Sequence, residues 1–455
     1  MSLSREDRVS RASENLSTAI RFKTVSNDDP DKEDVDEFKS FRAFLEKAYP
    51  LAHSRLEKEV IGESNLLYTW PGADAGARPL LLAAHIDVVP VEPGTLDDWT
   101  HPPFDGVIAD GFIWGRGTLD CKGPLIAILE AVEGLLDEGY LPDRTVFLAF
   151  GQDEELGGRR GAAKIAELLE SRGANPELVV DEGGALVQLG IPGFKRPIAG
   201  VGIAEKGYLT ADIEARAAGG HSSMPPRHTA IGLLARAITR LEKHQFPPSV
   251  GAIPAMTLER LLPELPAYLR FALGNPRLTG ILMKAASRWF APLSAMLRTT
   301  TAATMIRGGT KDNVLPQEAS ATVNLRLLPG ETYGCALARI RKVISDKRVT
   351  VRISGLAENP TRTSKVDSLG FEILERTIKE ICPEAVVVPY LVIGMTDSRY
   401  YARMSDSVFR FNPIRGGAEE QDLPHGTNER IPCDNFAELI DFYGLLIRNS
   451  SLPSA

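Results

Sequence analysis

Apolar residues follow two patterns along the first part of the chain: short continuous runs, and longer stretches with helical spacing. The runs at 78–84, 144–150 and 176–180 are typical of buried strands, whereas 123–139 and 160–173 have the spacing of helices. Strands and helices in this order form parallel sheets that are covered by helices. The pattern therefore predicts an α/β fold with a mostly parallel sheet flanked by helices.

The chain from residue 205 to residue 360 has a different pattern. Apolar and polar residues alternate along its expected strands, as in a sheet with one face in water. We therefore predict an inserted α+β sandwich, a lid domain, at 205–360, and assign 1–204 and 361–455 to the domain with the parallel sheet. The expected strands of the lid are 207–217, 318–328 and 349–355, and its expected helices are 229–244 and 331–346.

Residues 250–300 stand apart within the lid. They are rich in Leu, Ala and Pro, and they hold six basic side chains but two acidic ones. We interpret this segment as a helical insertion packed on the lid. An apolar cap over a substrate, or a surface for a partner, is the alternative interpretation.

The composition narrows the classes of function. A length of 455 residues allows two or three domains, and a net charge of −8 argues against a nucleic-acid partner. No apolar stretch approaches the ~20 residues of a membrane span, and the polar N-terminus lacks the core of a signal peptide. The four cysteines show no paired spacing. We therefore expect a reduced, cytoplasmic protein.

Histidine and carboxylate side chains follow the ends of the three predicted strands. His85 comes after the first strand, Glu154 and Glu155 after the second, and Glu182 after the third. The carboxyl ends of parallel strands meet at one edge of a sheet, so we expect these side chains to lie close together. The third strand end also offers Asp181, and the choice between the two acids stays open.

Two further candidates are Asp120, in the turn before 123–139, and His425, in a late loop. Carboxylates crowd together only where positive charge holds them, and no comparable cluster of Lys and Arg accompanies these. Imidazole and carboxylate together suit Zn²⁺, with Mn²⁺ or Co²⁺ as alternatives. A pair of ions about 3.5–4 Å apart would need a bridging carboxylate.

The adjacent glutamates suggest a division of labour. If Glu155 binds a metal ion, Glu154 stays free to act as the catalytic acid and base. An acidic surface turn is the alternative. Asp87 lies two residues after His85, on the same side of an extended chain, and so can accept the second imidazole N–H and orient the ring.

Several stretches together resemble one family of enzymes. They are AAHIDVVP, WTHPPFDGVIADGFIWGRGTLDCKG, FGQDEELGG, VDEGG, EKGYLTADIEARAAGGHSSMPP and LPHGTNERIP. In their order and spacing they resemble the M20 family of metallopeptidases, and most closely its branch of carboxypeptidase S and the N-acyl-amino-acid hydrolases. The resemblance covers about residues 15–450.

The resemblance implies a role for each metal-ligand candidate. One Zn²⁺ would be held by His85, Asp120 and Glu182, and Asp120 would bridge to a second Zn²⁺ held also by Glu155 and His425. Glu154 would be the general base and then the general acid, and Asp87 would orient His85. Cys121 departs from the pattern, because close relatives usually carry an acid at this position. We expect a small packed residue there.

The resemblance also implies roles for residues away from the metal ions. His221 would reach the active site of the other subunit of a homodimer and stabilise the oxyanion. Arg399 and Asn313 would bind the carboxylate of the substrate, because a guanidinium fork suits that group.

We therefore expect a di-zinc metallohydrolase that cleaves the amide bond of small peptides or N-acyl amino acids with a free carboxylate. It would be of the carboxypeptidase or aminoacylase type, and the preferred side chain or acyl group stays open. One alternative is a di-zinc aminopeptidase, which would recognise a free amine. The other is a metal-binding protein on a fold that has lost its catalytic activity.

Overall fold

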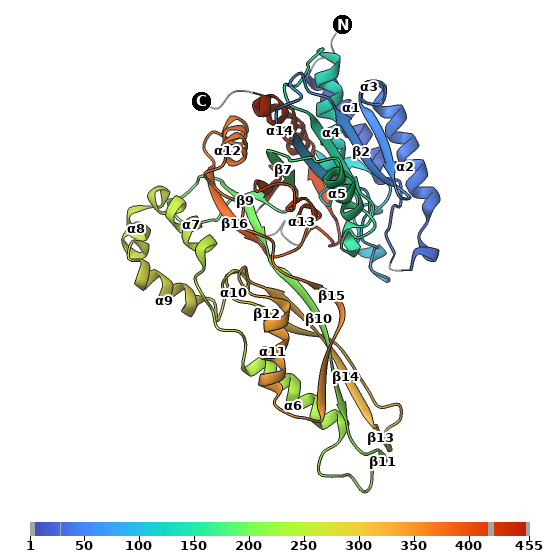
Figure 1. Cartoon of the computed structure of the whole chain (residues 1–455), viewed down its shortest axis with the longest axis vertical. Helices are drawn as coiled ribbons and strands as arrows, with labels where there is room; N and C mark the ends of the chain where they lie inside the picture. The colour runs from blue at the N-terminus through green and yellow to red at the C-terminus, as the bar shows by residue number, and fades with distance from the viewer. Residues whose placement is uncertain (1–4, 28, 417–422, 452–455) are drawn as a thin grey trace. The chain divides into compact units, whose positions relative to one another are not determined.

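The computed structural model describes residues 5–27, 29–416 and 423–451. The chain forms two compact units. The first comprises Met1–Ile203, Ser364–Tyr390 and Thr396–Ala455, and the second comprises Ala204–Thr363 and Leu391–Met395. Figure 1 labels the helices and strands of both units.

The first unit is built around one large sheet, with strands in the order β1-β2-β6-β3-β7-β17-β9-β8-β18 and with β16 paired to β9. Its centre, β6-β3-β7-β17, is parallel throughout, which confirms the mostly parallel sheet predicted from the sequence. The strands are β1 (Glu57–Ile61), β2 (Asn65–Trp70), β3 (Leu80–His85), β6 (Val146–Gly151), β7 (Leu178–Asp181), β8 (Ala185–Val187), β9 (Ile198–Glu205), β16 (Val386–Val392), β17 (Val408–Arg410) and β18 (Arg415–Gly416).

Helices cover this sheet, as the α/β pattern predicts. Every residue of β3 is buried, because α4 packs on this strand and Leu81 and Ala83 contribute to the core beneath α5. A strand covered on both faces needs a continuous apolar run rather than an alternating one. The helices of this unit are α1 (Arg5–Ile20), α2 (Val35–Ala48), α3 (Pro50–Arg55), α4 (Lys122–Asp137), α5 (Ala162–Ser171), α12 (Leu369–Ile381), α13 (Ser398–Tyr401) and α14 (Cys433–Ser451).

Shorter elements complete the first unit. A small antiparallel sheet has the order β19-β5-β4 and connects the two loops that carry Asp120 and His425. Its strands are β4 (Ile108–Ala109), β5 (Phe112–Trp114) and β19 (Arg430–Pro432), and the 3₁₀ helices are Pro30–Lys32, Leu96–Asp98 and Glu154–Leu156. Within the described ranges, no helix has both the length and the apolar character needed to cross a membrane.

The second unit contains an antiparallel sheet in the order β12-β14-β10-β15. Leu209, Ala211, Ile213 and Ala215 are fully buried and alternate with partly exposed residues, because helices α6 and α11 cover one face of the sheet. The elements are β10 (Gly207–Arg216), β11 (Gly220–His221), α6 (Ala230–Lys243), β12 (Thr300–Gly308), β13 (Val314–Leu315), β14 (Glu318–Leu327), α11 (Tyr333–Ile344) and β15 (Val349–Glu358).

The segment between α6 and β12 is helical. It consists of α7 (Ala252–Leu261), a 3₁₀ turn (Leu262–Glu264), α8 (Ala267–Leu273), α9 (Pro276–Ala286) and α10 (Ala291–Leu297). Helix α8 packs on α9, and α9 packs on α10. The end of α10 is fixed by the buried Lys206, whose Nζ donates to the carbonyls of Ala295 (2.9 Å) and Arg298 (2.8 Å). Burial, together with the nearby charge of Arg326, lowers the pKa of Lys206 to about 7.

This pKa predicts a pH dependence of stability. Between pH 7 and about 10.4 the unfolded chain keeps the Lys206 proton that the folded chain has released, so the free energy of unfolding should rise with pH. The contribution is at most about 1.4 kcal/mol per pH unit and ends below pH 7, where both states hold the proton. Urea unfolding of the wild type and of Lys206→Met at several pH values measures it. Equal pH slopes for the two proteins would contradict the prediction.

Candidate metal centre and active site

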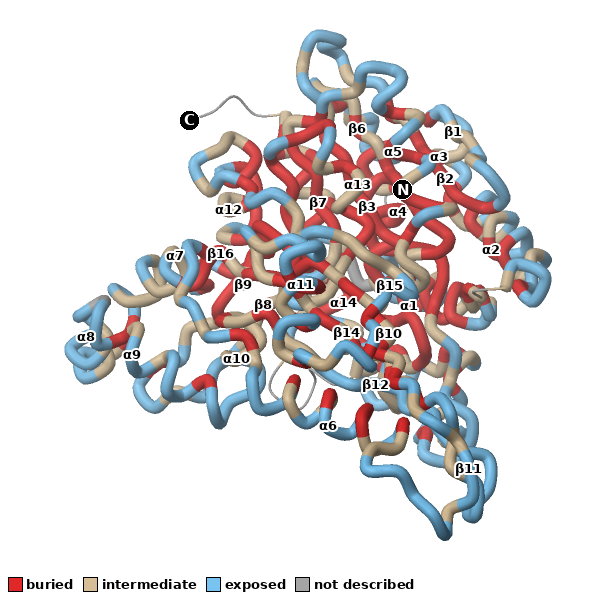
Figure 2. Tube along the Cα trace, turned by 60° about the horizontal axis from the view of Figure 1, so that its bottom comes forward, coloured by how far each residue is buried: buried red, intermediate tan, exposed pale blue. Residues whose placement is uncertain are grey.

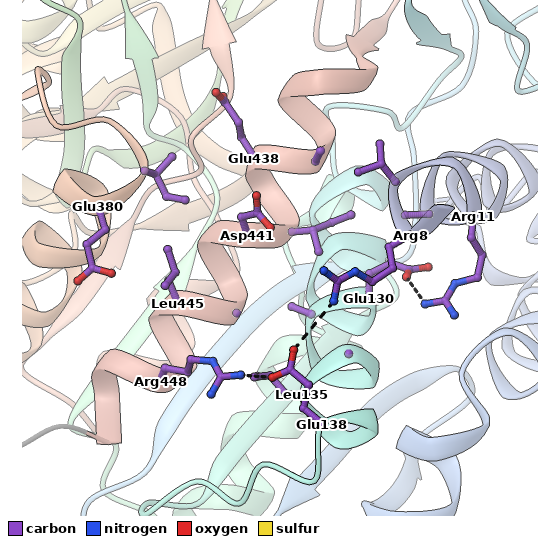
Figure 3. A pocket seen from close by; sticks show the side chains of 18 residues that line it. Arg8, Arg11, Glu130, Leu135, Glu138, Glu380, Glu438, Asp441, Leu445 and Arg448 are labelled. Atoms are coloured by element: carbon purple, nitrogen blue, oxygen red, sulfur yellow. Dashed lines mark hydrogen bonds and ion pairs between the residues drawn. The ribbon is translucent and has the colours of Figure 1, made fainter. Parts of the chain in front are cut away.

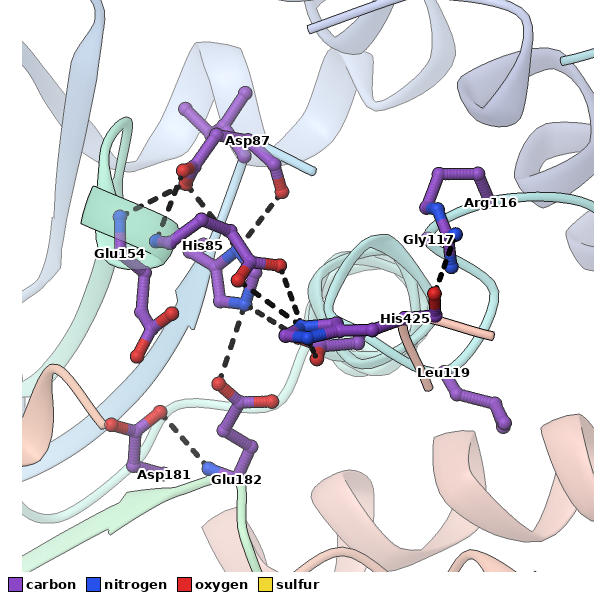
Figure 4. A network of polar contacts seen from close by, with 12 residues as sticks. His85, Asp87, Arg116, Gly117, Leu119, Glu154, Asp181, Glu182 and His425 are labelled. Carbon is purple, nitrogen blue, oxygen red and sulfur yellow. Dashed lines mark hydrogen bonds and ion pairs between the residues drawn. The ribbon is translucent and has the colours of Figure 1, made fainter. Parts of the chain in front are cut away.

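Neighbouring strands of the parallel sheet bring the predicted residues to one edge. His85 is the last residue of β3, and Glu182 directly follows β7. Glu154 and Glu155 begin the 3₁₀ helix after β6. Because β6 and β7 both pair in parallel with β3, the three strand ends lie side by side, as Figure 4 shows. The side chains predicted to meet therefore do meet.

The imidazole of His85 has a defined orientation. Its Nδ1 lies 2.9 Å from the carbonyl oxygen of Asp87 and 3.3 Å from Oδ1 of the same residue. A carbonyl can only accept, so Nδ1 carries the proton and Nε2 faces the cluster of acids. There Nε2 lies 2.8 Å from Oδ1 of Asp120 and 3.3 Å from Oε1 of Glu182. Two carboxylates and an imidazole nitrogen thus converge on one point.

Asp120 lies between two imidazoles. Its Oδ1 faces His85, and its Oδ2 lies 3.0 Å from Nε2 of His425. The same nitrogen of His425 lies 3.1 Å from the carboxylate of Glu155. One carboxylate therefore has an oxygen in each half of the cluster, which is the arrangement that a carboxylate bridging two ions requires.

The two acids at the end of β7 face different ways. Asp181 accepts the backbone N–H of Glu182 (2.9 Å) and that of Ser398 (2.7 Å), so its carboxylate stabilises two turns of the chain. Glu182 instead points toward His85 (Figure 4). The geometry favours Glu182 over Asp181 as a ligand, although the ligand assignment itself stays a prediction.

The carboxylate of Asp87 does more than the sequence analysis expected. Its two oxygens accept the backbone N–H groups of Glu154 (3.1 Å) and Glu155 (3.2 Å). Asp87 is fully buried, so it holds the turn with the two glutamates against the turn with His85. The spacing of Asp87 from His85 predicted the contact with the imidazole. Nothing in the sequence predicted its contact with the backbone of Glu154 and Glu155.

The pKa values show how much negative charge is collected here. Burial, together with the charge of Asp120, raises the pKa of Glu182 to about 8. Burial also raises the pKa of Glu154 well above its usual range. Hydrogen bonds with Asp120 and Glu155 raise the pKa of His425 to about 10. The cluster thus favours added positive charge, whether it comes from protons or from metal ions.

The donor set fits divalent metal ions. Single ligand atoms of His85, Asp120 and Glu155 lie within 4.8 Å of one another, and so do those of His85, Cys121 and Glu182. Imidazole nitrogen and carboxylate oxygen are ordinary ligands of Zn²⁺. Cys121 is fully buried, and burial raises the pKa of its thiol well above the usual range. A protonated, packed thiol agrees with the interpretation of this position as structural.

A buried ion pair joins two loops of the site that are far apart in the sequence. The side chains of Arg116 and Glu429 are 3% and 0% exposed, and their charged atoms lie 2.7 Å apart. Glu429 also accepts backbone N–H groups of the loop with Asp120, and Arg116 donates to the carbonyl of His425 (3.0 Å). The sequence analysis missed this pair, although both residues lie within the motifs WGRGTLDCKG and LPHGTNERIP.

Asp397 is a second residue that the sequence analysis missed. It is 3% exposed, and its carboxylate packs against the backbone of two glycines that flank the glutamate turn. A Cβ atom on Gly151 would lie 2.5 Å from Oδ2 of Asp397, and one on Gly158 would lie 2.1 Å from Oδ1. Burial raises the pKa of Asp397 well above its usual range. The glycines of FGQDEELGG thus make room for a buried carboxyl group beside the turn with Glu154 and Glu155.

The three predicted substrate residues lie on different units. Arg399 belongs to α13 in the first unit, next to Ser398, whose N–H donates to Asp181. His221 and Asn313 belong to the second unit, where β11 pairs with β13. The N–H of Ser222 donates to the carbonyl of Asn313 (3.1 Å), so the two residues lie near each other although they are 92 positions apart. Both are exposed.

A pocket of about 450 Å³ in the first unit adjoins the metal-ligand cluster. Asp120 and Glu182 form part of its wall, and most of the other lining side chains are apolar. The apolar members are Phe112, Leu119, Ala185, Val187, Ile414, Leu423, Pro424 and Pro432. An apolar group of a substrate would fit beside the cluster.

A second hollow of about 550 Å³ in this unit lies among α1, α4 and α14 (Figure 3). Its basic side chains are paired, Arg11 with Glu130 at 3.3 Å and both Arg8 and Arg448 with Glu138. Among the described residues that line it there is no histidine, no cysteine and no predicted site residue. We assign the chemistry to the cluster around Asp120 instead.

Comparisons with known proteins show the family of this chain. Residues 81–449 match the model of peptidase family M20/M25/M40. The chain is 41% identical to a probable carboxypeptidase S-like 2 of Dictyostelium discoideum, over 96% of this chain and 84% of that protein. It is 37% identical to the human N-fatty-acyl-amino acid synthase/hydrolase PM20D1, over 98% of this chain and 89% of that protein.

Solved structures agree in fold. The M20 family metallo-carboxypeptidase Sso-CP2 from Sulfolobus solfataricus superposes with a TM-score of 0.70 at 20% identity, over 96% of this chain and 98% of that one. Fold and site together define a metallopeptidase. The chain belongs to the peptidase M20/M25/M40 family, and it is a hydrolase of that metal-dependent class.

The buried ion pair gives a test of how the site is assembled. Glu429→Gln leaves Arg116 buried without its partner, which should cost about 3–5 kcal/mol of unfolding free energy. It should also lower the metal content, because the loops with Asp120 and His425 are no longer joined. Denaturant unfolding and elemental analysis measure the two effects.

The matched control is Glu438→Gln, which removes the acid of the more exposed pair Arg415–Glu438. That change should cost no more than about 1 kcal/mol and leave the metal content unaltered. Equal metal content in wild type and Glu429→Gln would show that the ion pair does not organise the site.

Proposed function

We propose that this chain is a dinuclear metal amidohydrolase, with Zn²⁺ as the expected ion and Mn²⁺ or Co²⁺ as alternatives. The observation that carries the proposal is Asp120, whose two carboxylate oxygens each face a different imidazole, His85 and His425. Glu182 would complete the first half of the site and Glu155 the second. Bound divalent ions would supply Lewis-acid polarisation of the amide carbonyl and would lower the pKa of a water molecule.

In this proposal Glu154 moves the proton. Its carboxylate accepts a proton from the attacking water, and its carboxyl group later donates that proton to the nitrogen of the leaving amine. The raised pKa of Glu154 suits this task, because the group must hold the proton between the two steps. Asp87 positions Glu154 by accepting its backbone N–H, and it keeps the proton of His85 on Nδ1.

The substrate class follows from the relatives and from the pocket. Relatives at 36–41% identity are named as carboxypeptidase S-like proteins or as N-fatty-acyl-amino acid synthase/hydrolases. The apolar pocket beside Asp120 and Glu182 supports a substrate with an apolar acyl group or side chain. We therefore propose N-acyl amino acids and small peptides with a free carboxylate as substrates, with Arg399 binding that carboxylate.

The roles of His221 and Asn313 stay predictions. His221 would donate to the oxyanion, and Asn313 would bind the carboxylate end of the substrate. The homodimer in which His221 serves the other subunit is likewise a proposal.

The two adjacent glutamates should respond differently to substitution. Glu154→Gln should keep the metal content while kcat falls by roughly 10²–10⁴-fold, because the proton carrier is lost. Glu155→Gln should bind less metal, because a ligand is lost. Elemental analysis and steady-state kinetics on the same preparations separate the two cases. Loss of metal in Glu154→Gln would contradict the division of labour.

Substrates that differ at their carboxyl end or at their amino end test the proposed substrate class. An N-acyl amino acid should be hydrolysed faster than its C-terminal amide, and Arg399→Leu should reduce the kcat/KM for the free acid by about 10- to 100-fold. The same substitution should change kcat/KM for the amide little. Removal of metal with a chelator should abolish both activities. Preference for an amidated dipeptide with a free amine would instead indicate an aminopeptidase.

A further inference from the structure

Helix α9 carries its apolar side chains on the face toward solvent. Leu278, Ile281 and Leu282 are 48%, 65% and 45% exposed, and their spacing puts them on one stripe. The polar residues Thr279 and Ser287, at the other side of this helical segment, are 1% and 3% exposed. A helix at the surface of a globular protein normally has the reverse arrangement. The stripe is therefore a surface that the second unit itself leaves uncovered.

Exposed aromatic side chains lie on the segments before and after α9. Phe271 on α8 is 92% exposed, and Trp289 and Phe290, after α9, are 91% and 60% exposed. Helix α8 packs on α9, and Figure 2 shows both helices largely exposed. Exposed tryptophan and phenylalanine on an amphipathic helical segment are typical of elements that insert into the boundary of a bilayer.

The charges beside the stripe are positive. Arg277, Lys284 and Arg288 follow one another at intervals of seven and four residues, which places them along one border of the stripe. Residues 250–300 hold six basic and two acidic side chains, a net charge of +4 in a chain whose net charge is −8. The insertion thus has a net positive charge, whereas the rest of the chain has a net negative charge.

A hollow of about 580 Å³ lies along the same border. Among the described residues that line it, four are cations, Lys243, Lys284, Arg288 and Arg298, and none is acidic. Its other walls include Ile281 of the apolar stripe. A cationic hollow that is continuous with an apolar stripe complements an anionic headgroup that is attached to acyl chains.

We propose that the insertion at residues 250–300 is an interfacial docking element that binds the surface of an anionic phospholipid bilayer. The stripe on α9 and the adjacent aromatic residues enter the acyl boundary, and headgroup phosphates occupy the cationic hollow. A second copy of the chain fits this surface less well, because a two-fold interface places the same patch on both copies, and the described residues of the hollow offer no acidic side chain to pair with the cations of the partner. The proposal is independent of the substrate of the enzyme.

The test is sedimentation of the full-length, metal-loaded enzyme with vesicles of phosphatidylcholine alone or with 30% phosphatidylglycerol. We expect binding to the anionic vesicles that weakens with salt, and little binding to phosphatidylcholine. Trp70 and Trp99 are buried and Trp114 is half-buried in the first unit, so a blue shift that depends on the 91% exposed Trp289 reports insertion. Trp289→Phe should bind the vesicles without that shift.

Two double variants separate the apolar and electrostatic contributions. Ile281→Glu with Leu282→Glu, and Lys284→Glu with Arg288→Glu, should each weaken binding to anionic vesicles at least tenfold. Hydrolysis of a soluble substrate should be unchanged, which shows that both variants fold. The matched controls, Leu141→Glu and the pair Lys195→Glu with Lys365→Glu, change exposed residues of the first unit and should bind as the wild type does.

Two results would overturn the proposal. One is equal binding by the wild type and both double variants, or no binding to anionic vesicles at all. The other is a change from dimer to monomer in light scattering when Ile281 and Leu282 are replaced, which would assign the stripe to a contact between copies of this chain.

Discussion

Mutual repulsion among carboxylates is the constraint on which this structure depends. Asp120, Glu154, Glu155 and Glu182 converge at one edge of the sheet, where burial makes each negative charge costly. Among the described residues, two imidazoles offset part of this negative charge. In a metal-dependent hydrolase of the M20 family, divalent ions would neutralise the rest. The fold brings the acids together because β6, β3 and β7 run parallel and end at the same level.

The sequence was informative about this edge because its signals are local. Apolar runs marked the strands, and each strand end carried its own histidine or acid, so His85, Glu155 and Glu182 could be predicted to meet. Asp120 and His425 were found through the motifs around them, and the choice between Asp181 and Glu182 needed the direction of a side chain. That direction depends on the hydrogen bond from Ser398, a residue 217 positions beyond Asp181.

What the sequence did not reveal are buried polar contacts between distant segments. Asp87 was expected to serve His85, but it also fixes the turn of Glu154 and Glu155. Glu429 and Asp397 had no assigned role. Such groups satisfy backbone N–H groups or fill space beside glycines, and neither task leaves a periodic pattern. Such contacts hold the side chains of the candidate site in place, and they arise from packing that no sequence motif records.

The position of β17 in the sheet sets the order in which this enzyme can mature. Strand β17 (Val408–Arg410) lies between β7 and β9, and it comes from a part of the chain made long after both neighbours. Until it is inserted, the middle of the sheet has an open gap between β7 and β9. The sheet that carries Glu182 can therefore close only after the C-terminal segment has been made and has joined it.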